Sequence, residues 1–386
     1  MNKLAVSIVM IFAVLLTNTV VFADSGAQGP EEASSEISRQ EPGILQLEPS
    51  KEYTVEELQE IAARNSRQAF ADDVDIKRKE LAVRTVRSDI NAMSDSILSV
   101  TKPMNVKLEL EVAKRTKQDH LNQLKVDVYK TCMDILLCGR KIQMLEKKLS
   151  LAEKRLEMAK ARLNAAMVIR DEVDSAQYAV DSSRADLESA RDELDALYLE
   201  LKRLLNLPLD TVPVKVAEEL KQDDVVDVDT DLILEGLYET ETSVFMAAGK
   251  LEIARAAMEI AAKLYRKGDL YYDSAVLDME EAELDLAAAK TALEVKVKNA
   301  YNDMANRADS LDLVKKYAEL TAKKLGSIKT KYEKGAVSME DCIKAEEALL
   351  DAEFAELSAI VEYNAARAVF INITGLDRPV KLSGME

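Results

Sequence analysis

Proline is missing from two very long stretches of this 386-residue chain, one between Pro103 and Pro208 and the other between Pro213 and Pro379. Because proline removes a backbone donor and clashes with the preceding helical turn, proline-free stretches of helix formers permit helices of unusual length. The same stretches are dominated by Ala, Leu, Glu and Lys, and aromatic residues make up only 5% of the chain. This pattern is typical of long helices and coiled coils, not of several ordinary globular domains.

Apolar residues recur at the 3,4 spacing of heptad a and d positions, which places them along one side of a helix. In the first half of the chain they are Ile142, Leu145, Leu149, Ala152, Leu156, Ala159 and Leu163, and in the second half Leu311, Val314, Ala318, Thr321, Leu325, Ile328 and Tyr332. A second stripe in the first half, Met144, Leu151 and Met158, lies beside the first. Two adjacent stripes predict that a long helix contacts neighbours on two sides, in a ring or sheet of helices.

The two halves are repeats of one another. Residues 151–177 align without gaps on residues 320–346, an offset of 169, and the half-ends LNLPLD and NITGLD also match. A duplication of this size indicates one helical unit built twice. Six helices are expected, over 54–100, 105–167, 172–205, 231–265, 273–333 and 339–373. Gly335 is expected to end the fifth helix in a left-handed conformation.

The chain is expected to be exported to the cell envelope. Lys3, an apolar run and small residues up to Ala23 indicate a signal peptide over 1–23, which is either cleaved or retained as an anchor. The predicted parts that follow are a disordered leader (24–52), a first helical repeat (53–205), a linker (206–230), a second helical repeat (231–378) and a tail (379–386). The linker carries two prolines and an acidic run.

Composition excludes several classes of function. One histidine and three scattered cysteines cannot supply a cluster of metal ligands, so neither a metal nor a cofactor is expected. A formal net charge of −18 repels phosphates and argues against a nucleic-acid partner. The acidic pairs Asp171/Glu172 and Glu340/Asp341 lie at predicted helix starts, where they complement the helix dipole. With His120 interpreted as a solvated surface residue, no enzyme is expected.

Several segments resemble the TolC-type outer-membrane efflux family. Residues 53–90, the run YEKGAVSMEDCIKAEEALLDAE at 332–353 and the terminal NITGLD carry the similarity, which covers nearly everything from 53 to 378. The resemblance implies a homotrimer whose twelve long helices form a tapering tunnel for exported small molecules or proteins. It also implies an inner-membrane transporter and a periplasmic adaptor-type protein as partners.

One departure from the family concerns the membrane. Each repeat of the family inserts two membrane-spanning strands between its first and second helices, and a spanning strand needs about 9–11 residues. The gaps here are roughly 98–108 and 266–274, and VKLELEV at 106–112 fits the start of a helix better than a strand. We therefore expect an all-α fold of long antiparallel coiled-coil helices in two tandem repeats, with the β-barrel strands absent or vestigial. Outer-membrane insertion is then doubtful.

The second of the two short connections that replace the strands, 266–274, has a notable composition. Leu270, Tyr271 and Tyr272 are candidates for a peripheral membrane contact, and a local packing cluster is the alternative.

The resemblance also implies a gate at the helix–helix turns. Asp341 takes the place of a first ring of acidic residues, and Lys344 stands where a second ring would be. Tyr332 keeps the family's gating tyrosine, and Glu172 matches an acidic partner in the first repeat. Val337 replaces the arginine expected to tie these residues, so closure is expected to depend more on coiled-coil packing. The candidate constriction residues are Asp171, Glu172, Tyr332, Gly335, Glu340 and Asp341.

Two interpretations of Asp341 stay open. Three copies in a ring would repel one another, favour cations and raise the carboxylate pKa. Alternatively, Asp341 merely stabilises the start of the last helix. Two functions stay open as well. The leading one is a trimeric efflux or secretion conduit in the cell envelope, and the alternative is a non-conducting exported coiled-coil spacer.

Overall fold

The computed structural model describes residues 51–89, 96–210, 214–226 and 228–376, all of which belong to one compact unit. The predicted signal peptide and tail lie outside the described residues, as does the predicted leader except for residues 51 and 52. The described strands are β1 (Glu52–Tyr53) and β2 (Lys215–Val216), which pair in parallel. Nearly everything else is helical, which confirms the predicted all-α fold.

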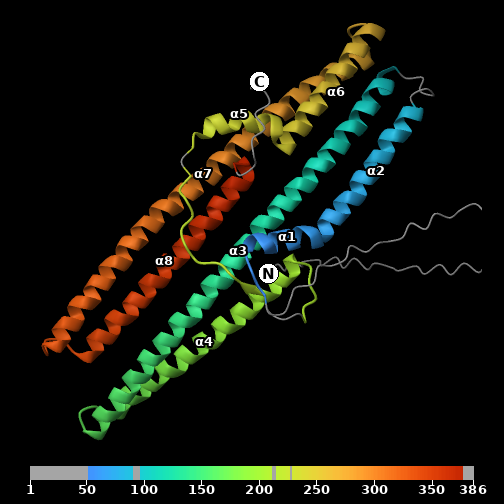
Figure 1. Ribbon diagram of the computed structural model, residues 1–386. Coiled ribbons are helices and arrows are strands. Elements are labelled where there is room, and N and C mark those ends of the chain that lie inside the picture. The colour runs from blue at the N-terminus through green and yellow to red at the C-terminus, as the bar shows by residue number, and fades with distance from the viewer. Residues whose placement is uncertain (1–50, 90–95, 211–213, 227, 377–386) are drawn as a thin grey trace, which may run out of the picture. The chain divides into compact units, whose positions relative to one another are not determined.

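The helices form two sets of four with closely similar lengths (Figure 1). The first set is α1 (Val55–Asn65), α2 (Arg67–Asp89), α3 (Ser96–Asn164) and α4 (Arg170–Leu204). The second set is α5 (Thr230–Thr240), α6 (Thr242–Leu264), α7 (Leu270–Glu333) and α8 (Met339–Thr374). Because α1 and α5 both have 11 residues and α2 and α6 both have 23, the duplication extends across the whole helical unit.

The offset of 169 residues holds at the turns that follow α3 and α7. The C-termini of α3 and α7 are separated by this offset, and so are the N-termini of α4 and α8. Beyond α4 and α8, Asn206 and Gly375 adopt the same left-handed conformation, with φ of 51° and 69°. These two residues also lie 169 apart, whereas the pairing of LNLPLD with NITGLD has an offset of 167. That sequence pairing is therefore wrong by two residues.

Each repeat begins with two helices where the sequence predicted one. Ser66 and Glu241 both have extended backbone, with ψ of 116° and 133°. Ser66 Oγ accepts a hydrogen bond from the amide of Ala69 at 3.1 Å. Glu241 Oε2 accepts from the amides of Ser243 and Val244 at 2.7 and 3.1 Å. A side-chain acceptor that satisfies these amides stabilises a new helix start, so the expected helices over 54–100 and 231–265 are each interrupted.

The first interhelical connection lies earlier than predicted. Residues 98–108 are helical, because α3 begins at Ser96 and includes Pro103. Segment 106–112 is helical as favoured from its sequence. Proline removes one hydrogen bond near the helix start, but this part of α3 packs along both α2 and α6, which keeps it helical. The connection itself, 90–95, lies outside the described residues. The corresponding connection in the second repeat runs only from the end of α6 at Leu264 to Leu270.

The order of neighbouring helices is simple. Along one half of its length α3 packs between α4 and α8, and along the other half between α2 and α6 (Figure 1). Among the described helices, α7 packs against α8, α6 and the short helix α5. The neighbour order is therefore α4–α3–α8–α7 at the interhelical turns after α3 and α7, and α2–α3–α6–α7 at the other end.

Both stripes predicted on α3 are buried, each against a different helix. Leu149, Ala152 and Leu156 pack with Val173, Ala176 and Val180 of α4. Met144, Leu151 and Met158 pack with Ile343 and Leu350 of α8. The prediction of neighbours on two sides is confirmed for α3.

The linker between the repeats is fixed to α8. Asn364 donates to the carbonyl of Lys221 at 2.8 Å and accepts from the amide of Asp223 at 3.0 Å. Arg367 Nε donates to the carbonyl of Asp224 at 2.9 Å. The second repeat therefore holds the segment that leads into it.

Neither a disulfide nor a membrane-crossing helix is found among the described residues. Cys132, Cys138 and Cys342 are buried free thiols, and burial raises the pKa of Cys132 to about 12. They act as small packing residues. None of the described helices combines the length and the apolar character required to cross a membrane.

Candidate constriction at the interhelical turns

The turns after α3 and α7 have the same backbone design. Ala166 and Gly335 occupy equivalent positions and both have positive φ, 53° and 72°. The next amides, those of Met167 and Ala336, each donate at 2.9 Å to the carbonyl five residues before them. This six-to-one hydrogen bond is the Schellman motif, which satisfies carbonyls left free at a helix end. The left-handed conformation expected of Gly335 is present, and an alanine adopts it in the first repeat.

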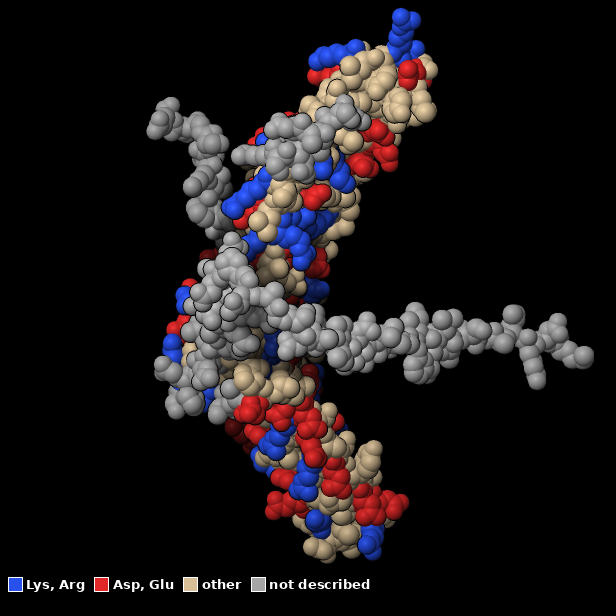
Figure 2. Space-filling model, turned by 90° about the vertical axis from the view of Figure 1, so that its right-hand side faces the viewer, with Lys and Arg blue, Asp and Glu red and all other residues tan. Residues whose placement is uncertain are grey.

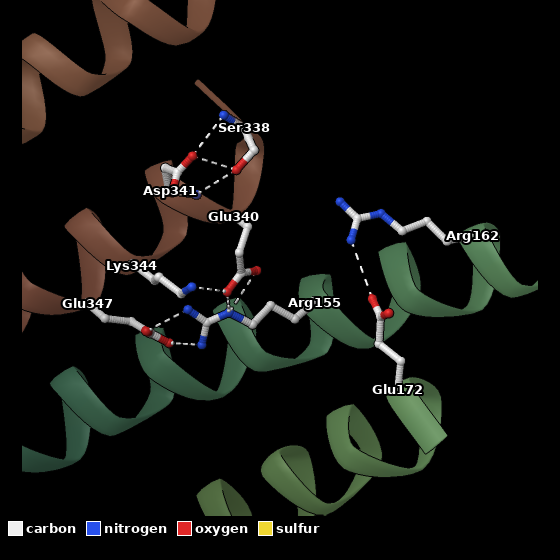
Figure 3. Close-up of polar contacts among 8 residues, drawn as sticks. All are labelled: Arg155, Arg162, Glu172, Ser338, Glu340, Asp341, Lys344 and Glu347. Atoms are coloured by element: carbon white, nitrogen blue, oxygen red, sulfur yellow. Dashed lines mark hydrogen bonds and ion pairs between the residues drawn. The ribbon is translucent and has the colours of Figure 1, made fainter. Parts of the chain in front are cut away.

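Asp341 caps the last helix in the single chain. Its carboxylate accepts hydrogen bonds from the amide and hydroxyl of Ser338 at 2.9 and 2.6 Å, and its own amide donates to the Ser338 hydroxyl at 3.2 Å. These bonds form a reciprocal capping box (Figure 3). Hydrogen bonding from Ser338 lowers the pKa of Asp341. Asp341 thus stabilises the start of α8 in the single chain. A ring of three such carboxylates would require two further chains.

Glu340 lies beside Asp341 and contacts a different helix. Arg155 reaches from α3 toward α8, with Nε 3.2 Å from Glu340 Oε1 and two bonds of 2.6 and 2.8 Å to the carboxylate of Glu347 (Figure 3). Lys344 Nζ lies 3.6 Å from Glu340 Oε1. All three partners of the central cluster are largely shielded, since the side chains of Arg155, Glu340 and Glu347 are 24%, 32% and 25% exposed. Bidentate, partly desolvated pairs of this kind are stronger than ordinary surface ion pairs.

The acidic residues of the first turn have other contacts. Glu172 lies 3.4 Å from Arg162 Nη1, and this pair joins the end of α3 to the start of α4 within one repeat (Figure 3). Asp171 precedes it in the first turn of α4. Tyr332 is 43% exposed near the end of α7. Among residues 51–376 as described, no hydrogen bond or ion pair joins Tyr332 or Asp341 to the first turn.

The cross-repeat link through Arg155 and Glu347 was missed by sequence analysis. The notable signal is the spacing of Glu340 and Glu347, seven residues apart, which places both carboxylates on one side of α8. A second link, between Lys148 of α3 and Asp351 of α8, supports it. These pairs tie α3 to α8 one turn or more away from the interhelical turn itself. The apolar packing and the ion pairs of Arg155 therefore lie in the same interface between α3 and α8.

His120 is an exposed surface residue, as expected, and it also has a partner on α2. Its Nδ1 lies 2.9 Å from Asp72 Oδ2 of α2. The contact helps to join α2 to α3, beside the ion pair of Lys117 and Asp73 at 2.6 Å. Among the described residues no group of three or more metal-ligating side chains gathers in a metal-binding arrangement.

One face of α7 stays uncovered where the equivalent face of α3 is buried. At the offset of 169, Leu313 and Leu320 correspond to Met144 and Leu151. They are 69% and 62% exposed. Tyr317, between them, is also exposed. Among the described residues, no helix takes the place beside α7 that α8 takes beside α3, so this apolar stripe lies at an open edge.

Solved structures share this arrangement of helices. The CmeC outer membrane channel of Campylobacter jejuni matches with a TM-score of 0.67 and 12% identity, over 83% of this chain and 85% of that one. A membrane protein from Pseudomonas aeruginosa matches with a TM-score of 0.67 and 12% identity, over 83% and 90% of the two chains. The outer membrane protein VceC from Vibrio cholerae matches with a TM-score of 0.64 and 12% identity, over 83% and 96%.

These likenesses establish the fold. The chain has the fold of TolC-type outer membrane channels, as the sequence resemblance implied. No protein-family model matches the sequence, and no curated protein matches it.

Proposed function

We propose that this protein is the subunit of a trimeric helical conduit in the cell envelope, working in efflux or secretion with an inner-membrane pump and a periplasmic adaptor-type protein. The observation that carries the proposal is the open edge of α7. At the offset of 169, the exposed Leu313 and Leu320 repeat Met144 and Leu151, which α8 covers on α3, and the exposed Tyr317 lies between them. Leaving such a stripe in water forfeits roughly 25 cal/mol per Å² of apolar surface.

The internal repeat suggests what covers this edge. The partner of α3 at its equivalent stripe is α8, and the first-repeat equivalent of α8 is α4. The uncovered α7 of one chain would therefore pack beside α4 of the next. At the offset of 169, Lys324 takes the place of Arg155 and Asp171 takes the place of Glu340. The ion pair between Arg155 and Glu340 within the chain then predicts a pair between Lys324 and Asp171 of two chains.

The other end of the array has complementary edges as well. There the outer helices are α2 and α7. On α2, Phe70 and Leu81 are 52% and 60% exposed near the basic run Lys77 to Lys79. On α7, Leu277 and Leu284 are 64% and 71% exposed and flank acidic residues over 278–283. Exposed apolar residues on both edges, with Lys77 and Arg78 before Leu81 on α2 and acidic residues between Leu277 and Leu284 on α7, favour packing of α2 against α7 of another copy.

Because the edges differ, this contact is head-to-tail and generates a closed ring when the rotation between copies closes. The TolC-type fold supports three copies. In such a ring, three α7–α8 turns would bring together Asp341 and Tyr332, and Glu172 would lie on the alternating turns. The proximity of three carboxylates would oppose the capping effect and raise the pKa of Asp341 above its value in the single chain.

A crosslinking experiment tests the assembly. In the exported chain, Lys324→Cys combined with Asp171→Cys should be joined into covalent trimers by a short bis-maleimide, whose spacer replaces the reach of the two lost side chains, and the buried native cysteines should not react. Asp351→Cys with Asp171→Cys serves as the matched control, since Asp351 faces α3 inside the chain. Detergent-free sedimentation of the unmodified chain should give a trimer. A monomer that persists at high concentration would contradict the proposal.

A second experiment separates the conduit from a non-conducting spacer. Cells of the native host that carry only Asp341→Cys should export cargo until a bulky maleimide is added, and export should then fall by at least about tenfold. Cells with the wild-type chain should be insensitive to the reagent because their thiols are buried. Unchanged export after complete labelling of a confirmed trimer would favour the spacer.

A further inference from the structure

The turn between α6 and α7 exposes an unusual set of side chains. Leu264, Leu270 and Tyr271 are 54%, 79% and 62% exposed at the very end of this helix pair. Lys263, Arg266 and Lys267 lie among them in the sequence. Figure 2 shows basic side chains protruding at this end of the chain among uncharged and a few acidic ones, at the top of the view, where Figure 1 places the α6–α7 turn.

The turn is ordered by its own contacts. The rings of Tyr265 and Tyr271 are stacked, with centroids 5.0 Å apart and planes 25° apart. Asp269 caps α7 by accepting from the amide of Tyr271 at 3.2 Å, and Asp273 accepts from the amide of Gly268 at 3.2 Å. Gly268 supports the sharp bend with φ of 92°. The exposed leucine and tyrosines are therefore presented by a preformed turn and not by a loose loop.

The acidic and the basic side chains of the turn differ in their partners. Both aspartates are engaged by backbone amides. Lys263, Arg266 and Lys267 form no ion pair with any of the described residues. Three free cations beside exposed apolar side chains contrast with a chain whose net charge is −18. A surface of this kind suits a partner that is anionic on its outside and apolar just beneath.

We propose that the α6–α7 turn docks on an anionic membrane surface. Leu270 and Tyr271 would enter the headgroup region, where tyrosine is favoured because its ring is apolar and its hydroxyl polar. Lysine and arginine beside them would contact lipid phosphates while their stems cover apolar surface. The proposal stands on the turn alone and does not depend on conduction or trimerisation.

The absence of tryptophan from the sequence gives a direct local probe. In the full chain, Leu270→Trp should show blue-shifted emission and quenching by brominated lipids when mixed with vesicles of phosphatidylcholine and phosphatidylserine. Vesicles of phosphatidylcholine alone should give little change. Met167→Trp is the matched control, because Met167 is 77% exposed in the turn after α3. Its emission should stay unchanged, even when another part of the chain holds the protein on the vesicles.

The cations are tested in the Leu270→Trp background. Replacing Lys263, Arg266 or Lys267 by glutamine should weaken partitioning about fivefold for each cation removed. Higher salt should reduce binding of the Leu270→Trp chain more than that of the variant that also lacks all three cations. The proposal is overturned if the indole emission of Leu270→Trp stays that of a water-exposed residue with both kinds of vesicle, which would favour a protein as the occupant. Equal quenching of the Met167→Trp control would overturn it too.

Discussion

Helices α3 and α7 occupy equivalent positions in the two repeats but have different surroundings. On α3, Leu151 is 5% exposed because α8 covers it, whereas Leu320, its equivalent on α7, is 62% exposed. The side chains are identical and the backbones follow the same offset. The difference therefore lies in the neighbour and not in the helix. In the proposed trimer, another copy of the chain would cover this apolar stripe on α7.

The largest expected effect separates these two leucines. Leu151→Ala should lower the free energy of unfolding by about 2–4 kcal/mol, because it removes buried methyl groups between α3 and α8. Leu320→Ala should change it by less than about 0.5 kcal/mol in the isolated chain, as expected of an exposed site. Urea unfolding at a concentration where the chain is monomeric measures both.

Association should show the opposite order. Leu320→Ala should weaken the proposed trimer in sedimentation, while a trimer of undiminished stability would show that the α7 edge is not the interface. Equal unfolding effects of the two substitutions would contradict the burial difference itself.

The next effect concerns the charged residues beside these stripes. Arg155→Ala should cost about 2 kcal/mol of unfolding free energy, since it breaks a bidentate, partly desolvated pair with Glu347. Lys324→Ala, at the equivalent position on α7, should cost less than about 0.5 kcal/mol in the isolated chain. A double-mutant cycle of Arg155→Ala with Glu347→Gln should show a coupling within the range of about 0.5–3 kcal/mol. A coupling near zero would mean that the pair contributes only through packing.

The stripes and the turns were predictable from sequence because both are local patterns. Heptad spacing placed Leu151 on a second interface, and Gly335 marked a left-handed helix end before any neighbour was known. The interruptions at Ser66 and Glu241 were missed because a single capping residue inside a strongly helical segment gives little periodic signal. Arg155 was missed for another reason. Its partners lie 185 and 192 residues further along the chain, and only the packing of α3 on α8 brings them together.

The positions of the candidate constriction residues relative to one another were less predictable. Sequence inspection identified Glu340 and Asp341 as an acidic pair at a helix start, but their side chains make different contacts. Asp341 turns back to Ser338, while Glu340 reaches Arg155 on another helix. Helix starts orient adjacent side chains about 100° apart, so neighbours in sequence need not share a role.

A smaller effect should distinguish the two turns. Gly335→Ala should cost about 1 kcal/mol, because a side chain disfavours the left-handed conformation even though open space surrounds this position. Ala166→Gly, in the other repeat, should be neutral or stabilise by up to about 1 kcal/mol. Thermal unfolding of the two single variants and of the double variant tests this, and near-cancellation is expected in the double variant. Destabilisation by both substitutions would show that the turns differ in more than the residue they contain.

The smallest effect is the dependence of the Asp341 cap on pH. Since hydrogen bonds from Ser338 lower the pKa of Asp341 in the folded chain, its contribution is present above the ordinary aspartate pKa and is lost as the pH falls through the folded value. Wild type should therefore be more stable than Asp341→Asn at neutral pH, and the difference should disappear as the pH falls below the ordinary aspartate pKa and through the lower folded value. In a Ser338→Ala background the difference at neutral pH should shrink. A constant difference at every pH would contradict the assignment.

The continuity of α3 and α7 has a mechanical consequence. With 69 and 64 residues, each helix is roughly 100 Å long and has no break along its length. Its companions are shorter and meet it on either side of the middle, so each long helix can act as a lever with its pivot near the short helix of its own repeat. A tilt of about 5° around such a pivot would move each end by about 4 Å in opposite directions. In the proposed trimer, a wider tunnel at the turns after α3 and α7 would then be coupled to an inward movement of the α6–α7 end.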